Sequence, residues 1–553
     1  MSGLARSYGI ALAGLSGVPI EVQTHIGPGL VGTTLVGLPD TSLREAKERV
    51  RAALFSCGIG AVNERVTVNL TPADLPKAGS GFDLAIAVSM LIARRILPEV
   101  AGTDTIYMAE LGLDGSLLPV CGVLPASAAA AANSFQRIVV APENEAEARL
   151  LEELEVVGCA HLDELLAAFR VEPDPQGGTL AVGDGRWKSL KALSTHRTRN
   201  GGSETSAVPE VQVDPTIDGP DLADVHGQGD AVLALTIAAV GGHHLLLHGP
   251  PGAGKTMLAR RLPGILPDLN TSDSLVATAL RSIGSTSGVA IGGEVSSLAG
   301  DRSPALIRRP PLESPHHSAT MISLVGGGNP IRPGAVSLAH AGVLLLDEAP
   351  EFSQRTLDAL RQPIEQAQVT VHRAKTQVTF PAKFQLVMTA NPCPCGGAIS
   401  GDADSCHCSP HRIGLYRSRL SGPLLDRIDL QIHVDRPKHL DLVHSTSTTT
   451  EAVAEMVSLA RERSTYRLRT TPWNVNGEVP GRFIRQSEQI SGRYTRELER
   501  LVERGILSLR GADRVLRMAW SSADLFGRAE PHADDLSLAM KLRGMTEGAP
   551  SWI

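Results

Sequence analysis

The sequence predicts an α/β fold, with a parallel sheet in its core, a separate α/β domain before the core and a helical lid after it. Three segments indicate the sheet, because HHLLLHGPPGAGKT, GVLLLDE and FQLVMTANP each contain an apolar run that ends in glycine or polar residues. Strands that are apolar almost throughout are buried on both faces, as in a parallel sheet covered by helices. Past residue 437 the pattern turns helical, as in EAVAEMVSLARERSTYRL, which indicates the lid.

Length and charge set the limits for domains and partners. The chain has 553 residues, which suits about three to four domains. The predicted segments are 1–170, 171–211, 212–436 and 437–553. The net charge of −7 excludes a general attraction to nucleic acid or anionic lipid, so any DNA contact needs a local basic surface.

Several features favour a cytoplasmic protein without a membrane span. No run of about 18 apolar residues is present. The glycines near the N-terminus continue a strand-like pattern and do not suggest a signal peptide. Of the seven cysteines, three are isolated (Cys57, Cys121 and Cys159) and four share one loop, which is not a secreted disulfide framework.

The first segment, 1–170, alternates strand and helix patterns. Val66–Leu70 and Arg137–Pro142 are expected to be strands, and Phe82–Ala93 a helix packed on the first of them. The following stretch, 171–211, is rich in Gly, Pro, Ser and Thr and has little periodicity, so we interpret it as a flexible linker.

A phosphate-binding motif lies between a predicted strand, Leu245–Leu247, and a predicted helix, Met257–Leu262. It fits G-x-x-x-x-G-K-[ST] without a mismatch, and its residues are Gly249, Pro250, Pro251, Gly252, Ala253, Gly254, Lys255 and Thr256. The glycines let successive backbone N–H groups face phosphates. Lys255 is expected to reach the β- and γ-phosphates of ATP, and the Thr256 hydroxyl to bind Mg²⁺.

Two other predicted strands end in residues that suit hydrolysis. Asp347 and Glu348 follow GVLLL, where Asp347 would hold the metal through water and Glu348 would activate the attacking water. The alternative is that both acids only cap the next helix. Asn391 ends VMTAN and is expected to orient water against the γ-phosphate, although it could also be a turn residue before Pro392.

At this point the chain resembles a known family. The segments DLADVHGQGDAVLALTIAAVGGHHLLLHGPPGAGKTMLARRLPGILP, SPHHSATMISLVGGGNPIRPGAVSLAHAGVLLLDEAPEF and LSGPLLDRIDLQIHV resemble the Mg-chelatase-like AAA+ ATPases called ComM or YifB. The resemblance covers nearly the whole chain except the linker. It implies a ring, most simply a homo-hexamer, that hydrolyses ATP and moves along single-stranded or branched DNA, with roles in branch migration and recombination.

The resemblance also assigns residues. It implies that Arg427, in LLDRID, is an arginine finger that neutralises charge on the γ-phosphate of a neighbouring subunit. The alternative is a helix-surface arginine paired with Asp426 or Asp429. Arg510, in SLRGADR, resembles the sensor arginine of the lid, with Arg514 as the other candidate.

Two further assignments concern the nucleotide base and the ring pore. Gln228 is placed by the resemblance near adenine. Ser314–Pro330 and the hairpin-like Val369–Phe384 match inserts that face the pore in related rings, and the cations of the second insert could track DNA phosphates: Arg373, Lys375 and Lys383. The alternative is a solvated hairpin with ordinary surface charges.

The N-terminal segment NLTPADLPKAGSGFDLAIA resembles the proteolytic domain of Lon-type proteases, which use a Ser–Lys dyad. Gly81 falls on the nucleophile position, Ala126 on the lysine position, and Ser80 is one residue out of frame. A Lon-like fold without peptidase chemistry is therefore expected. An ATP-dependent protease is a less favoured reading of the chain, and a magnesium-chelatase motor subunit is the main alternative to a DNA motor.

Four cysteines form two C-x-C pairs after Asn391: Cys393 and Cys395, then Cys406 and Cys408. Four thiolates could close on one Zn²⁺ as a structural tetrahedral site, with His407 or His411 able to replace one sulfur. Reduced cysteines and redox pairing are the alternatives.

Overall fold

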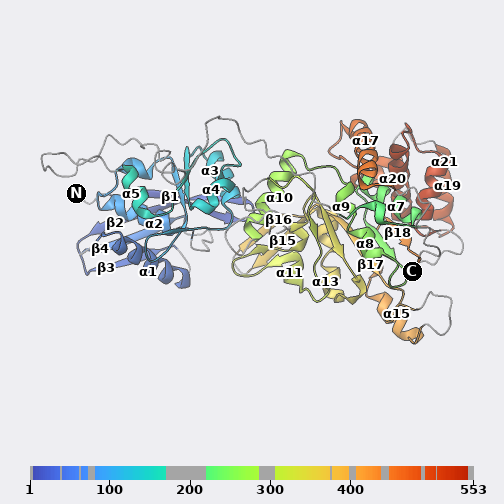
Figure 1. The fold of residues 1–553 in the computed structure, drawn as a ribbon, viewed down its shortest axis with the longest axis horizontal. Helices are drawn as coiled ribbons and strands as arrows, with labels where there is room; N and C mark the ends of the chain where they lie inside the picture. Colours follow the sequence, from blue (N-terminus) through green and yellow to red (C-terminus); the bar gives the residue numbers. More distant parts are fainter. Residues whose placement is uncertain are drawn as a thin grey trace.

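The computed structural model describes residues 4–37, 40–60, 64–72, 81–169, 220–284, 306–373, 376–397, 406–436, 448–486, 492–505 and 507–545. The predicted linker 171–211, Ser80 and Lys375 lie outside these ranges. Figure 1 shows the N-terminal domain as one lobe and the nucleotide-binding core with its lid as a second, larger lobe. In the described part of the chain, no helix has the length and apolar character needed to cross a bilayer.

The N-terminal domain is built on a seven-stranded mixed sheet with the order β3-β4-β2-β1-β5-β8-β9. Its β1–β2 and β2–β4 pairs are antiparallel and the others parallel. The strands are β1 (Ala5–Ala13), β2 (Ser16–Gly27), β3 (Gly32–Val36), β4 (Arg65–Thr71), β5 (Thr105–Met108), β8 (Arg137–Val140) and β9 (Glu155–Gly158), with the short pair β6 (Glu110–Leu111) and β7 (Leu117–Leu118).

The helices of this domain are α1 (Asp40–Ser56), α2 (Asp83–Ala93), α3 (Val123–Ala132), α4 (Pro142–Ala148) and α5 (Leu162–Phe169). Helix α2 is buried from Asp83 to Ile92, and it packs on β1, β2 and β5. Its apolar composition follows from this central position. The carboxylate of Asp83 is compensated by Arg49 of α1, whose Nε lies 2.6 Å from it. The predicted strands are confirmed as β4 and β8, and the predicted helix as α2. The expected packing of this helix on Val66–Leu70 differs, because β4 lies outside β2 in the sheet and α2 packs chiefly on β1, β2 and β5.

The core of the second lobe is a five-stranded sheet with the order β11-β14-β17-β10-β18, and every neighbouring pair is parallel. The strands are β10 (Leu245–His248), β11 (Leu312–Glu313), β14 (Val343–Leu346), β17 (Gln385–Ala390) and β18 (Leu430–His433). Leu245 and Leu247 join one hydrophobic cluster and Leu246 another, so both faces of β10 are covered. The predicted parallel sheet is confirmed.

Short helices connect these strands. They are α7 (Gly229–Gly241), α8 (Lys255–Ala259), α9 (Leu262–Ile265), α10 (Thr271–Gly284), α11 (Met321–Val325), α12 (Ala335–Leu338), α13 (Gln354–Asp358), α14 (Arg361–Gln366), α15 (Pro410–Ser418) and α16 (Gly422–Leu425). The helical lid contains α17 (Thr450–Leu468), α18 (Gly481–Gln486), α19 (Gly492–Glu503), α20 (Leu509–Leu525) and α21 (Ala533–Leu542). The lid and the α7 side of the sheet share one hydrophobic cluster, so they pack as a unit.

The predicted hairpin insert is confirmed as β15 (Gln368–Arg373) paired with β16 (Thr376–Pro381). It is not a freely projecting loop. Phe380 is fully buried in a cluster with Leu280 of α10, and Leu15 of the N-terminal domain packs against that cluster. Lys383, just after the hairpin, pairs with Glu478 of the lid at 2.5 Å. Arg373 is exposed near the hairpin tip. The other predicted insert, Ser314–Pro330, contains α11 and β12 (Gly326–Gly327), and β12 pairs with β13 (Arg332–Pro333), which follows the insert.

Candidate nucleotide-binding site

The predicted catalytic segments meet at the carboxyl edge of the core sheet. His248, the last residue of β10, is in register with Ala390 of β17, and Leu346 of β14 with Met388 of β17. The P-loop follows β10, Asn391 follows β17, and the two acids follow β14. Because β17 lies between β10 and β14, Asn391 leaves the sheet between the phosphate-binding loop and the acids. This edge is where open parallel sheets bind ligands.

Lys255 is buried and points at the centre of this edge. Its Nζ donates to Asn391 Oδ1 at 3.0 Å and to the carbonyls of Gly249 and Pro250 at 2.9 and 2.8 Å. Burial lowers the pKa of Lys255, while the nearby Asp347 and Glu348 oppose that shift. The charged amine of Lys255 therefore lies among oxygen acceptors in a polar pocket. A triphosphate bound there would require such a positive charge.

Asp347 is held by two hydroxyl groups. Thr256 Oγ1 donates to Asp347 Oδ1 at 2.8 Å, and Thr389 Oγ1 donates to the same oxygen at 2.6 Å. Thr389 also accepts a hydrogen bond from the backbone N–H of Glu348 at 2.9 Å. One buried threonine thus fixes both acids relative to the P-loop helix.

Glu348 occupies a left-handed backbone conformation, with φ of 51°. Such a conformation costs a non-glycine residue about 1–3 kcal/mol and is often found at functional sites. Glu348 precedes a short 3₁₀ turn, Ala349–Glu351, but its side chain makes no capping hydrogen bond. The simple helix-capping alternative therefore lacks its defining contact, and the carboxylate is left for another use.

The residues present suit Mg²⁺ and a triphosphate. Thr256 Oγ1 and the Asp347 carboxylate supply adjacent oxygen ligands of the kind Mg²⁺ prefers. Gly252 and Gly254 have φ of 76° and 84°, which side chains rarely adopt, so the loop needs glycine to curl. A Cβ added to Gly252 would meet no atom within 4 Å, so the loop opens outward there.

Gln228 contacts the P-loop from its other side. This residue immediately precedes α7, and its Nε2 donates to the Ala253 carbonyl at 2.5 Å. Among the described residues its Oε1 is buried without a hydrogen-bond partner. A free buried acceptor beside the P-loop is compatible with the expected place of Gln228 near the nucleotide.

Two residues at this edge were not singled out from the sequence. Thr389 was hidden inside a strand, and only its place one residue before the strand end could have indicated it. Arg436 follows β18 and donates Nε and Nη2 to the Pro251 carbonyl at 3.0 and 2.8 Å. A basic residue shortly after a core strand was the available signal.

Arg427 lies at the opposite edge of the sheet. It precedes Leu430, which pairs with Leu245 at the start of β10, whereas the P-loop follows the end of β10. Its guanidinium donates to the Pro423 carbonyl at 2.5 Å and pairs with Glu365. The ion pair suggested with Asp426 or Asp429 is therefore replaced by one with Glu365.

The two lid arginines lie near Arg427 and not near the P-loop. Arg427, Arg510 and Arg514 all line one cavity of about 1400 Å³ between the core and the lid, and none of residues 249–256 lines it. Arg510 is exposed in the first turn of α20. The structure thus groups the three arginines on one edge, and the phosphate-binding residues on the other.

The four cysteines of the loop after Asn391 converge. Sγ of Cys393 lies 3.3 Å from Cys395 and 3.7 Å from Cys406, and the Cys395–Cys406 separation is 3.6 Å. All four sulfurs lie within 4.8 Å of one another, so the cluster could hold a metal ion. A tetrahedral zinc with Zn–S bonds of about 2.3 Å places sulfurs about 3.8 Å apart. The hydrogen bond from the Gly397 N–H, and then those from the neighbouring thiols, lower the pKa of Cys395 to about 6. The hydrogen bond to Cys395 raises the pKa of Cys408, so the thiolate is favoured at Cys395 within the cluster.

The fold and this constellation define a P-loop ATPase of the AAA+ class. The family description "Magnesium chelatase, subunit ChlI" matches residues 221–442, which contain the core sheet and the P-loop. "Subunit ChlI of Mg-chelatase" matches residues 22–144, and "Magnesium chelatase, subunit ChlI C-terminal" matches residues 447–543.

Relatives that match nearly the whole chain identify the family within this class. An uncharacterized protein of Mycobacterium tuberculosis is 41% identical over 98% of both chains. The uncharacterized protein YifB of Escherichia coli is 37% identical over 93% of this chain and 92% of its own. The competence protein ComM of Haemophilus influenzae is 34% identical over 98% of both chains. The chain belongs to the ComM/YifB family of Mg-chelatase-like AAA+ proteins.

The two positions of the N-terminal domain that match the Ser–Lys dyad of Lon-type proteases hold Gly81 and Ala126, and neither residue has a reactive side chain. Gly81 lies just before α2, and Ala126 is a buried residue of α3. Ser80 lies outside the described residues. The description that matches 22–144 names the chelatase subunit, so a Lon-type origin of this domain remains a resemblance in sequence.

Thr389→Val tests whether Asp347 and Glu348 depend on this threonine. The substitution keeps the shape but removes both hydrogen bonds, and loss of such a supporting contact typically costs about 10- to 100-fold in activity or metal affinity. ATPase rates measured against Mg²⁺ concentration should show that loss. Thr236→Val is the matched control, because Thr236 is also buried but bonds only the Val232 carbonyl of its own helix. Equal rates for both variants would contradict the assignment.

Proposed function

We propose that the protein is a Mg²⁺-dependent ATP hydrolase whose active sites form between adjacent subunits of a ring. The observation that carries the proposal is the separation of two half-sites. Lys255, Asn391, Asp347 and Glu348 share the carboxyl edge of the core sheet, and Arg427 lies at the amino edge.

At the carboxyl edge of the core sheet, each residue of the nucleotide site has a defined role. Bound ATP·Mg²⁺ supplies the γ-phosphoryl group and a cation that offsets its charge. Lys255 holds the β- and γ-phosphates, and Thr256 with Asp347 holds the metal. Glu348 accepts a proton from the attacking water, and Asn391, bonded to Lys255 at 3.0 Å, orients that water.

The distance across the sheet supports a site shared by two subunits. Strand β10 has four residues, so the Cα atoms at its two ends are about 10 Å apart. The length of this strand separates Arg427 from the P-loop of its own chain, and Arg510 borders the same cavity as Arg427. Stacking identical subunits head to tail would bring this arginine edge to the P-loop edge of the neighbour. Heterologous contacts of this kind close into rings, and a homo-hexamer is the ring that the family resemblance favours.

The work driven by ATP is proposed to be movement along DNA, including branched junctions. A full-length relative is named a competence protein, which supports a role in handling incoming DNA. The hairpin β15–β16 exposes Arg373 near its tip, where a ring pore would present it to phosphates. Such contacts track the backbone without reading bases.

A second candidate is a motor subunit that drives metal insertion into a porphyrin. It is favoured by the family descriptions, all three of which name the chelatase subunit ChlI. The two functions predict different stimulators of the same ATPase. Stimulation by forked or single-stranded DNA supports the DNA motor, and stimulation by porphyrin-pathway partners alone supports the chelatase.

Glu348→Gln tests the hydrolytic assignment. The variant should bind ATP with unchanged affinity, and its DNA-stimulated hydrolysis should fall by about 10²- to 10⁴-fold, because the amide cannot accept the proton. Fluorescent-nucleotide binding and phosphate release give the two readouts. Glu351→Gln is the control, since Glu351 lies in the same turn but pairs with Arg419. A Glu348→Gln protein that hydrolyses ATP normally would contradict the assignment.

Arg427→Ala tests the shared site. A homo-oligomer of this variant should bind ATP but lose about 10³- to 10⁵-fold in turnover, as expected for an arginine finger. Mixing it with Lys255→Ala subunits, which have a defective P-loop and an intact Arg427, should restore part of the activity. Native mass should first show that the rings contain both variants. If such mixed rings regain no activity, the proposal of a site shared in trans is contradicted.

We propose that the four-cysteine cluster holds a structural Zn²⁺ that supports the P-loop. A Cβ built on Gly396 would lie 2.6 Å from Pro251, so the cysteine loop packs directly on the P-loop. Cys393 is fully buried and follows Asn391 by two residues. The loop is thus placed to stabilise both.

Metal analysis tests the zinc proposal. Wild-type protein should contain about one tightly bound zinc per cysteine cluster. Cys395→Ser should lose it and show a raised KM for ATP, whereas Cys121→Ser, at an isolated cysteine, should do neither. The comparison of variants is decisive because Cys57, His161 and Asp163 also lie close enough together to bind a metal. Equal zinc in wild-type and Cys395→Ser protein would contradict the proposal.

A further inference from the structure

Two arginines of the lid donate hydrogen bonds to the backbone of the short segment that carries Arg427, residues 427–429. Arg514 of α20 donates Nη1 to the Arg427 carbonyl at 2.9 Å. Arg543, which follows α21, donates Nη1 to the Ile428 carbonyl at 3.1 Å and to the Asp429 carbonyl at 3.4 Å. Three consecutive peptide carbonyls of the core thus receive guanidinium groups from the lid, so this segment cannot move independently of it.

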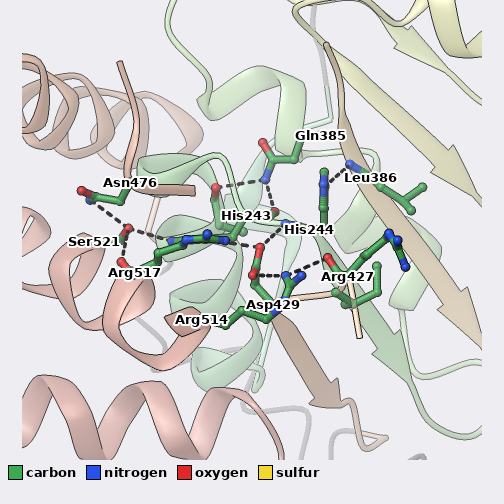
Figure 2. A network of polar contacts seen from close by, with 12 residues as sticks. His243, His244, Gln385, Leu386, Arg427, Asp429, Asn476, Arg514, Arg517 and Ser521 are labelled. Carbon is green, nitrogen blue, oxygen red and sulfur yellow. Dashed lines mark hydrogen bonds and ion pairs between the residues drawn. The ribbon is translucent and has the colours of Figure 1, made fainter. Parts of the chain in front are cut away.

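Asp429 strengthens this connection on the lid side. Its side chain is 5% exposed, and its carboxylate accepts a hydrogen bond from Arg514 Nη1 at 2.5 Å. Figure 2 shows the Arg514 guanidinium reaching both the Asp429 carboxylate and the Arg427 carbonyl. Both hydrogen bonds come from one nitrogen, Nη1. A lysine side chain places its ammonium one bond closer to the backbone than Nη1, so it does not reach both acceptors from the same position.

The same aspartate also contacts the strand that leads to the P-loop. Asp429 Oδ2 accepts the backbone N–H of His244 at 3.2 Å, and the Asp429 N–H donates to the His244 carbonyl at 3.1 Å. His244 immediately precedes β10, whose other end leads into the P-loop. Asp429 belongs to the same segment as Arg427. It is therefore bonded both to the lid and to the residue that precedes the P-loop strand.

Charge makes this connection costly to break. Burial would raise the pKa of Asp429, but Arg514 and the two neighbouring histidines, His243 and His244, hold it well below its ordinary value. The carboxylate therefore stays ionised. Removing one partner of a buried ion pair leaves an uncompensated charge, so the two groups remain together as the lid moves.

We propose that Arg514 and Asp429 are positioning residues through which the lid sets the placement of Arg427 on the nucleotide of the adjacent subunit. The proposal rests on the proposed function, in which Arg427 acts in trans. Through His244, the same pair links that placement to the P-loop strand of its own chain. Nucleotide binding in one subunit would then be felt at the arginine finger that the subunit offers to the next.

Another ion pair in the lid provides a control. Arg528 Nη1 lies 2.7 Å from Asp535 Oδ1, and the two side chains are 30% and 1% exposed. The corresponding values for Arg514 and Asp429 are 13% and 5%. Asp535 also accepts a hydrogen bond from Ser522 within the lid, and neither Arg528 nor Asp535 has a hydrogen bond to the segment 427–429 among the described contacts. Arg467 is unsuitable as a control, because Asn476, Ser521 and His243 connect it to Asp429.

The test compares Arg514→Lys with Arg528→Lys in assembled full-length protein. Arg514→Lys should lower kcat by about 10- to 100-fold, because a displacement of about 1 Å from the reacting group can cost 10²-fold. Its KM for ATP should stay close to the wild-type value, since its own P-loop is intact. Arg528→Lys should keep both kcat and KM, and native mass should show the same oligomer for both variants.

Mixed rings separate positioning from folding. Adding Lys255→Ala subunits to Arg514→Lys subunits should raise hydrolysis, because each supplied subunit places a correct Arg427 beside an intact P-loop. If Arg514 only stabilised its own subunit, KM would rise and mixing would not help. Asp429→Asn should reproduce the Arg514→Lys defect, and the double variant should be no worse than either single one.

The outcomes also distinguish this inference from the function on which it rests. Rescue of Arg427→Ala without rescue of Arg514→Lys would overturn the positioning role and leave the shared site standing. Failure to rescue either variant in mixed rings would overturn the shared site itself. Normal kcat in Arg514→Lys would overturn the positioning role directly.

Discussion

The architecture depends on one constraint: a parallel sheet gathers the residues that follow its strands at one edge, and those that precede its strands at the other. The P-loop, Asp347, Glu348 and Asn391 all follow strands of the core sheet. Arg427 precedes one. Because every strand pair in this sheet is parallel, the length of a strand separates Arg427 from the P-loop of its own chain. Under the proposed function, each chain would carry halves of two different active sites.

The lid is joined to both halves. Its helices share a hydrophobic cluster with α7 and with the residues of β10 that face it. On the polar side, Arg514 and Arg543 bond the backbone of the segment 427–429. A shift of the lid therefore acts on the arginine edge directly and on the P-loop strand through His244. In the proposed ring, each subunit would donate Arg427 to one neighbour and accept it from the other, and such a linkage has the form needed for ordered hydrolysis.

The parts of the site formed by consecutive residues could be predicted from the sequence, because each is a short motif with a known chemical role. The P-loop and the LLLDE strand end are of this kind, and the structure places them together. Thr389 could not be predicted in the same way, because its bonds to Asp347 and Glu348 run across two strands. The partner of Arg427 was also beyond the sequence. Glu365 is distant along the chain, while the nearby Asp429 is used by Arg514.

The lid arginines show the same limit at a larger scale. Resemblance indicated Arg510 as a sensor of nucleotide, but only the fold shows that it borders the cavity of Arg427 and not its own P-loop. The hairpin insert was predicted from its alternating pattern, yet the burial of Phe380 beside Leu280, with Leu15 of the N-terminal domain packed nearby, required knowledge of how the two lobes meet. The four cysteines were predicted as a cluster, and their contact with the P-loop through Gly396 was not.

Specific ATPase activity measured over a wide range of protein dilution, with subunit assembly followed in parallel, tests the shared site most directly. If every site needs an arginine from the next subunit, turnover per chain must fall as the oligomer dissociates and approach zero for the monomer. Monomeric protein that hydrolyses ATP at the full rate would contradict the account.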